Sequence, residues 1–189
     1  SATVSPEIQQ VAKQSLRPGH VFVDCVGEEE SATNLQVKQS LVSAAQVDQF
    51  AVLKSILDEH CAKTPNHKVM CFFTTARATQ LAAELFQRIL PTDVIEIHSK
   101  LSQSRRTKAT DQFRDAARAV MMTSDVTARG IDFPDVSLVI QIGAPSDRAQ
   151  YIHRLGRTAR AGKSGEGVLV LAPEEDYFAR DDVRDLPMA

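Results

Sequence analysis

Cysteines are few in this chain, and none of them stands close to another. Cys25, Cys61 and Cys71 are widely spaced, whereas metal-binding and disulfide-rich domains need cysteines in close pairs. The sequence therefore predicts neither a metal site nor a disulfide framework. Cys25 and Cys71 lie within apolar runs, so they are expected to be buried thiols in a reducing compartment.

Long hydrophobic runs are lacking as well. No stretch approaches the roughly 20 apolar residues that cross a membrane, and no signal-peptide pattern stands at the beginning. We therefore expect an intracellular protein with no membrane partner, and the mitochondrial matrix, the nucleus and the cytoplasm all stay open. The chain begins at Ser1 rather than at Met, which indicates a piece of a longer protein.

A phosphate-binding loop is missing, although one segment imitates it. Gly162-Lys163-Ser164 matches the end of such a loop, but Arg157 stands where the loop needs its first glycine. The loop should also follow a strand, whereas this segment follows a predicted helix. We interpret it as a helix stop with a basic turn.

Net charge is close to zero, but the charges are segregated. The chain has 22 Lys and Arg against 24 Asp and Glu, a net charge of −2. Residues 98–118 carry six basic side chains against two acids, and residues 147–163 carry five against one. Residues 174–185 run the other way, with six acids against two arginines. This pattern predicts a basic face on a nearly neutral protein.

Short apolar runs alternate with helical patterns along most of the chain. Such alternation predicts a mostly parallel sheet covered by helices on both faces, the α/β class. The predicted strands are 20–26, 35–42, 69–73, 94–97, 119–123, 136–142 and 168–171. The predicted helices are 5–16, 46–60, 76–90, 102–115 and 147–160, with Val47 on a buried side and a packed C-terminal segment that includes Tyr177.

Three arginines recur at every third residue in the last predicted helix. Arg154, Arg157 and Arg160 would be neighbours on one helix face, and a guanidinium offers a planar fork that fits phosphate oxygens. A single arginine would be interpreted as a solvated surface residue. Three of them behind His153, with no acid among them, predict an anion site.

Polar residues also follow the predicted strands. In parallel sheets, functional groups gather at the carboxyl ends of the strands. Hydroxyls can cap a helix or touch a phosphate, an amide and a guanidinium near a helix start can share one anion, and an acid suits sugar hydroxyls. The residues in question are Thr74, Gln103, Arg106, Ser124, Arg129 and Asp132.

Two of these segments carry a resemblance to a known family. Ser124-Asp125-x-x-Ala128-Arg129-Gly130-x-Asp132, followed by His153-Arg154-x-Gly156-Arg157-x-x-Arg160, resembles the second RecA-like domain of DEAD-box RNA helicases. The strand ending Phe72-Phe73-Thr74-Thr75 is similar to that family's fourth motif, and Ser1-Ala2-Thr3 to its hinge-side motif. The resemblance spans residues 1 to 180, and it looks closest to the fungal mitochondrial RNA-chaperone members.

The resemblance implies a fold and a function. The fold would be a RecA-like three-layer sandwich, with a hinge and first helix at residues 1–19, a helicase C-terminal domain at 20–172 and a C-terminal helical segment at 173–189. The function would be that of the C-terminal half of an ATP-dependent RNA helicase or RNA chaperone, inactive by itself. ATP with Mg²⁺ would be bound mainly by the N-terminal RecA-like domain of the same protein.

The resemblance also implies roles for single residues. Arg157 and Arg160 would be arginine fingers on the ATP, and Asp132 would bind its ribose. Contacts between the two domains would come from His153, Arg154 and Arg129. The backbone of RNA, regardless of sequence, would be held by Thr74, Gln103, Arg106 and Ser124. The protein is expected to be a monomer.

Some positions depart from the family pattern, and two other interpretations stay open. Ser99 and Ala159 stand where glycine is usual, Ser124 stands where threonine is commoner, and the segment 141–145 lacks the usual Tyr-Asp pair. One alternative is a helicase of a neighbouring family. His153 and the Ala-Arg-Gly-x-Asp run argue against this alternative. The other is a non-catalytic RNA-binding or adaptor module on the same fold.

Overall fold

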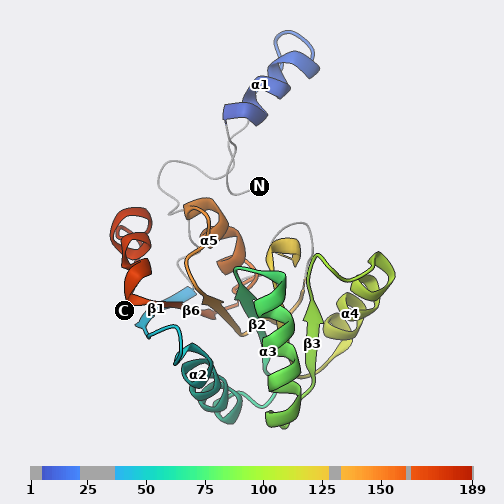
Figure 1. Cartoon of the computed structure of the whole chain (residues 1–189). Coiled ribbons are helices and arrows are strands. Elements are labelled where there is room, and N and C mark those ends of the chain that lie inside the picture. The colour runs from blue at the N-terminus through green and yellow to red at the C-terminus, as the bar shows by residue number, and fades with distance from the viewer. Residues whose placement is uncertain (1–5, 22–36, 128–132, 161–162, 189) are drawn as a thin grey trace.

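The structure is a computed structural model that describes residues 6–21, 37–127, 133–160 and 163–188 (Figure 1). Several features predicted above therefore lie outside the described residues, wholly or in large part. They include the Ser1-Ala2-Thr3 motif, the strand predicted at 20–26 with its thiol Cys25, Gly162 of the predicted helix stop, and the residues Arg129 and Asp132.

Within the described residues, six strands form one parallel sheet, and they correspond to six of the seven strands that the sequence predicts. In space their order is β1-β6-β5-β2-β4-β3, and every neighbouring pair is parallel. The central strands β2, β4 and β5 are buried along their whole length, which requires cover on both faces of the sheet. The strands are β1 (Val37–Ser43), β2 (Lys68–Phe73), β3 (Val94–Ile97), β4 (Ala119–Thr123), β5 (Leu138–Ile142) and β6 (Gly165–Leu171).

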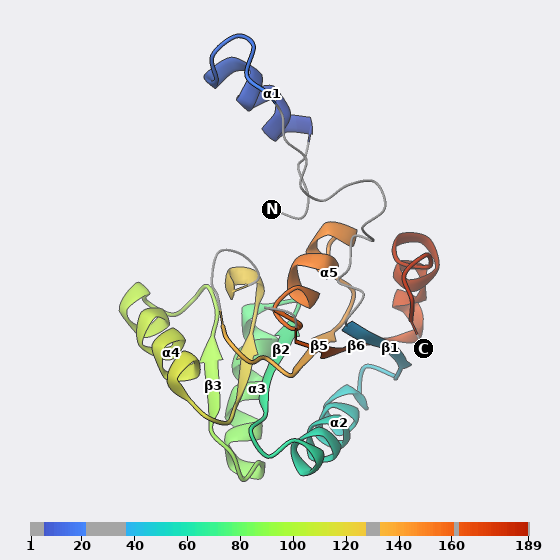
Figure 2. The ribbon, with the colours of Figure 1, turned by 180° about the vertical axis from the view of Figure 1, so that it is seen from behind.

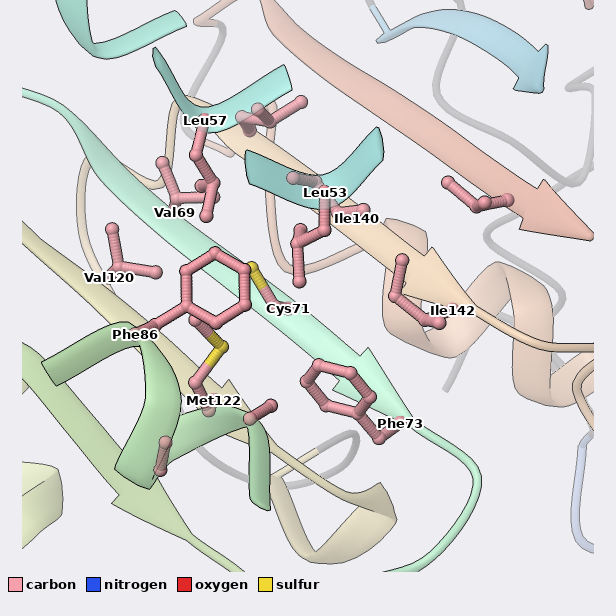
Figure 3. Packing of buried hydrophobic residues seen from close by; sticks show 14 residues of the cluster. Leu53, Leu57, Val69, Cys71, Phe73, Phe86, Val120, Met122, Ile140 and Ile142 are labelled. Carbon is pink, nitrogen blue, oxygen red and sulfur yellow. The ribbon is translucent and has the colours of Figure 1, made fainter. Parts of the chain in front are cut away.

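Two helices cover one face of the sheet. They are α2 (Gln49–Lys63) and α3 (Ala76–Ile89), and they bury Leu53, Leu57 and Phe86 against Cys71 and its neighbours on the strands (Figure 3). Helix α3 lies in front of the sheet in Figure 1 and behind it in the opposite view of Figure 2. The buried Cys71 confirms the expectation for that thiol.

The other face is covered by α4 (Gln103–Asp115) and α5 (Arg148–Leu155). Phe113 of α4 packs against Met70 and Phe72, whose side chains leave β2 on the side opposite Cys71. Leu155 of α5 packs with a separate group on β6 and the C-terminal segment. Helices on both faces of a parallel sheet make a three-layer sandwich, which confirms the predicted architecture.

Side-chain caps explain where α3, α4 and α5 begin. The Thr75 hydroxyl accepts a hydrogen bond from the Ala78 nitrogen at the start of α3, at 3.1 Å. The Ser102 hydroxyl caps α4, and the Asp147 carboxylate caps α5 by accepting from the Gln150 nitrogen at 2.7 Å. Each cap satisfies a backbone donor that the first helical turn leaves unpaired.

Two packing predictions at element ends are wrong. Val47 is 89% exposed, because α2 begins only at Gln49. Tyr177 is 49% exposed, on the outer side of a helical segment that runs from the 3-10 turn Pro173–Glu175 into the π-helix Phe178–Asp182. The rest of that segment packs as expected, through Phe178, Val183 and Leu186.

The helix α1 (Pro6–Ser15) confirms the first predicted helix. Its start at a proline fits the rule that proline suits the first turn, where its missing N–H removes no helical hydrogen bond. Its end shortly before Pro18 fits the proline's exclusion of a continuing helix.

Candidate functional site

The helix that carries the arginines is shorter than the sequence predicts. Helix α5 ends at Leu155, so Arg157 and Arg160 follow it, and the prediction of three arginines in a row on one helix is wrong. The chain turns because the Thr158 hydroxyl is buried and donates to the Val136 carbonyl oxygen at 2.5 Å. Ala159 then adopts the left-handed backbone region, with φ of 54°.

Arg154 points into the domain instead of outward. Its side chain is 1% exposed, and it donates from Nε to Asp125 Oδ1 at 2.7 Å and from Nη2 to Asp125 Oδ2 at 3.1 Å. Its guanidinium also lies 5.5 Å from the centre of the Phe72 ring. The interdomain contact expected of Arg154 stays a prediction, although the side chain has almost no exposed surface in this domain.

Arg157 and Arg160 lie partly exposed around one hollow. Each Nε donates to a backbone carbonyl four residues earlier, Arg157 to His153 at 3.2 Å and Arg160 to Gly156 at 2.9 Å. Both side chains line a hollow of about 150 Å³, together with Lys163. Three cationic groups around one hollow form a donor set that suits a phosphate chain.

Lys163 is a member of this cluster that the sequence did not indicate. It forms an ion pair with Asp135, and its hydrogen bond and charge lower the pKa of the Asp135 carboxyl. Sequence reasoning interpreted Lys163 only as part of a basic turn. Its position next to the arginines depends on β6 starting at Gly165, directly beside the end of the arginine segment.

The arginine hollow lies at the amino ends of the strands. Val136, Ser137 and Ser164, which line it, stand just before β5 and β6. This follows from the course of α5, which begins beyond the end of β5 and runs back along the sheet. The expectation that functional groups gather at the carboxyl ends therefore does not hold for these arginines.

The predicted strand-end residues lie at the opposite edge. β2 and β4 are parallel neighbours, with Phe72 paired to Thr123, so Thr74 and Ser124 both follow their strands at the carboxyl edge. Thr74 is exposed, whereas Ser124 is 7% exposed. Gly143 lies against Thr74, where a methyl group would meet the threonine Cγ2 at 2.9 Å.

Gln103 and Arg106 lie at the same edge of the sheet as Thr74 and Ser124. We call these four residues the strand-end surface. Gln103 and Arg106 line a hollow of about 230 Å³ together with Val126 and Thr127, which belong to the turn after Ser124. The Arg106 Nε is buried and makes no hydrogen bond within the part of the chain that the structure describes. A buried donor without a partner is costly, so a phosphate oxygen bound at this atom would remove that cost.

His98 is a further residue whose role the sequence did not reveal. It is 3% exposed, with Nε2 2.6 Å from Glu96 Oε1, and its Nδ1 accepts from the Lys100 nitrogen at 3.2 Å. These bonds shape the loop that leads to the Ser102 cap of α4. The imidazole therefore supports the position of Gln103 without facing the surface itself.

Two kinds of feature are absent from the described residues. No group of three or more His, Cys, Asp or Glu in the described ranges could hold a metal ion. No helix within those same ranges is long and apolar enough to cross a membrane.

Comparison with protein families and curated proteins gives two findings. Residues 48–162 match the family model of the helicase conserved C-terminal domain. The protein "DEAD-box ATP-dependent RNA helicase 26" of Arabidopsis thaliana is 49% identical over 188 residues, which cover 100% of this chain and 22% of the relative. The chain spans about a third or less of the length of the curated relatives it matches.

Solved structures give a third finding. Mss116p bound to single-stranded RNA and AMP-PNP matches with a TM-score of 0.88 and 32% identity, covering 98% of this chain and 37% of that one. Domain 2 of the Mss116p DEAD-box helicase bound to an RNA duplex matches with a TM-score of 0.71 and 34% identity, covering 79% and 60%. These likenesses confirm the RecA-like fold class.

Proposed function

The chain belongs to the helicase C-terminal domain family, in the form found in DEAD-box RNA helicases, and on that basis we propose that it is the C-terminal half of an ATP-dependent RNA helicase. One observation carries the proposal. The domain has two separate surfaces suited to anions, Arg157, Arg160 and Lys163 at one end of the sheet and Thr74 with the α4 start at the other. A protein that couples ATP hydrolysis to RNA binding needs two such surfaces.

The arginine hollow is the proposed nucleotide side. ATP with Mg²⁺ would be bound mainly by the N-terminal RecA-like domain, and Arg157 and Arg160 would face its phosphates when the two domains close. The fit rests on the cationic donor set around the hollow. In related NTPases an arginine at the transferring phosphoryl group contributes about 10³ to 10⁵ in rate. His153, Arg154 and Arg129 stay proposed interdomain contacts, and Asp132 stays the proposed ribose ligand.

The strand-end surface is the proposed RNA side. Thr74, Gln103, Arg106 and Ser124 offer hydroxyl, amide and guanidinium groups, which suit sugar and phosphate oxygens. Similar structures hold RNA, either single-stranded or duplex. We propose contacts to the RNA backbone regardless of sequence, in an intracellular protein that acts as a monomer. The fungal mitochondrial subtype stays a prediction.

ATP turnover by the full-length protein tests this function. We expect turnover that rises and saturates with RNA, because the nucleotide site is completed only when both domains close. A non-catalytic adaptor with the same fold would bind RNA without any turnover, so that result would overturn the proposal. The 189-residue chain alone should show no turnover, because it provides only one side of the nucleotide site.

A further inference from the structure

The Asp125–Arg154 pair joins the two proposed surfaces, with the Arg154 side chain 1% exposed and the Asp125 side chain 40% exposed. Asp125 directly follows Ser124 on the RNA side, and Arg154 stands three residues before Arg157 on the nucleotide side. Both oxygens of the carboxylate accept from the guanidinium, at 2.7 and 3.1 Å. A bidentate pair of this kind fixes orientation as well as distance.

On the RNA side, Arg154 contacts three elements that end at the strand-end surface. Its Nη1 is 3.5 Å from Gln141 Oε1 on β5, and its guanidinium lies over Phe72, two residues before Thr74 on β2. Asp125 begins the turn that includes Val126 and lines the Arg106 hollow. The guanidinium therefore holds β2, β5 and this turn in one arrangement.

On the nucleotide side, Arg154 lies within the helix end that holds Arg157. The Arg157 Nε donates to the carbonyl oxygen of His153, the residue next to Arg154. Gln141 adds a second connection, because its Nε2 donates to the Tyr151 carbonyl oxygen of α5 at 3.2 Å. A shift of Arg154 would therefore move the backbone to which Arg157 is bonded.

We propose that Asp125, Gln141 and Arg154 are positioning residues that set the place of Arg157 relative to the RNA-binding surface, so that stimulation of ATP turnover by RNA depends on them. The inference rests on the proposed function. None of the three side chains needs to touch RNA or nucleotide. If Asp125 loses its charge, Arg154 becomes a buried cation without its counter-ion, and the helix end has to shift to rehydrate it.

The same helix provides a matched control at its other end. Arg148, the first residue of α5, forms a bidentate ion pair with Asp185. This pair is of the same chemical type and also joins two elements, but the Asp185 side chain is 63% exposed, and Arg148 lies at the end of α5 opposite to Arg157. Asp185→Asn therefore removes an Arg–Asp pair from α5 without touching the proposed connection.

The experiment measures ATP turnover by the full-length protein, with and without a single-stranded oligouridine, for wild type, Asp125→Asn, Arg154→Lys and Asp185→Asn. Binding of the same RNA without nucleotide is measured separately. We expect Asp125→Asn and Arg154→Lys to lower the ratio of RNA-stimulated to RNA-free turnover about tenfold to a hundredfold, as small misplacements of catalytic groups do. RNA affinity should change by less than about threefold, since no RNA contact is removed. Asp185→Asn should keep the wild-type ratio.

Several results would overturn the inference. If Asp125→Asn and Arg154→Lys both keep the ratio within about threefold of wild type, the pair does not position Arg157. Equal loss of RNA affinity and of the ratio would show a purely structural role. If Asp125→Asn does not fold, the result for Arg154→Lys alone tests the inference. Lysine keeps the buried positive charge and loses only the planar guanidinium group that pairs with both carboxylate oxygens. A wild-type protein without RNA stimulation would instead refute the proposed function, and the inference with it.

Discussion

Thr158 and Gly165 pack so tightly that no side chain fits at residue 165. A methyl group there would lie 2.9 Å from the backbone nitrogen of Ala159 and closer still to the Thr158 hydroxyl. Thr158 is held in place by its hydrogen bond to the Val136 carbonyl oxygen. The turn between Arg157 and Arg160 thus takes its shape from contacts with the beginnings of β5 and β6.

We predict that Gly165→Ala destabilises the domain by about 1–3 kcal/mol, because the added methyl group overpacks a backbone that cannot yield. Urea denaturation of the 189-residue chain measures the change. Ser164→Ala is the control, because Ser164 is exposed next to it and should stay within about 0.5 kcal/mol of wild type. Equal stability of Gly165→Ala and wild type would show that the turn can move aside.

RNA binding should depend on the carboxyl edge of the sheet. Arg106→Ala should weaken binding of two unrelated RNAs about equally and lower the slope of log affinity against log salt by about one unit or slightly less, since one phosphate contact is lost. Gln103→Ala should weaken binding with little change in slope, because the amide is neutral. Titrations at several salt concentrations measure both effects.

Arg118→Ala is the control for this prediction. Arg118 belongs to the same basic segment and is exposed, but it precedes β4 and so lies at the amino edge. Its removal should leave RNA affinity nearly unchanged. An unchanged salt slope in Arg106→Ala, or strong discrimination between the two RNAs, would mean that the RNA surface lies elsewhere.

His60 should make stability depend on pH. Its imidazole lies 2.9 Å from the Ser137 hydroxyl and 3.5 Å from the Glu166 carboxylate. Burial lowers the pKa of His60 and outweighs Glu166, which raises it, while the charges of His67 and Lys63 lower it further. The unfolded chain then binds a proton at higher pH than the folded one, so stability is lost as the pH falls below about 6.5.

Melting temperatures between pH 5 and 8 test this sign. We expect His60→Gln to lose less stability than wild type on acidification, because the group that gains a proton on unfolding is gone. His20→Gln is the control, since His20 is exposed and should follow the wild-type curve. A His60→Gln curve parallel to wild type would show that other groups cause the acid sensitivity.

Regular elements could be predicted from the sequence because their signals are local. The strands β3 and β4 begin and end at the predicted residues, since short β-branched runs between helical patterns indicate buried parallel strands. The helix predicted from residue 76 likewise begins at Ala76, directly after the Thr75 cap.

The geometry of the site could not be predicted, because it depends on contacts between distant residues. Helix α5 ends at Leu155 because Thr158 bonds to Val136, which no helical periodicity reveals. Arg154 turns inward to form its ion pair with Asp125. Asp125 stands 29 residues earlier in the chain, so no local sequence pattern links the two residues. An arginine in such a sequence pattern can point into the domain or toward its surface. Only the folded structure therefore distinguishes the buried Arg154 from Arg157 and Arg160, which line the hollow.

The central claim is that nucleotide and RNA are bound at opposite edges of the sheet. Its most direct test substitutes one arginine in the full-length protein and measures ATP turnover and RNA affinity together. For Arg157→Lys, and separately for Arg160→Lys, we predict turnover about a hundredfold or more below wild type, because lysine keeps the charge and loses the planar fork. RNA affinity should stay within about threefold, since the RNA surface lies at the other edge of the sheet. Arg88→Lys, on the exposed end of α3, should change neither quantity. Turnover within about threefold of wild type for both substitutions, or RNA affinity that falls as far as turnover, would contradict the assignment of these arginines to a separate nucleotide site.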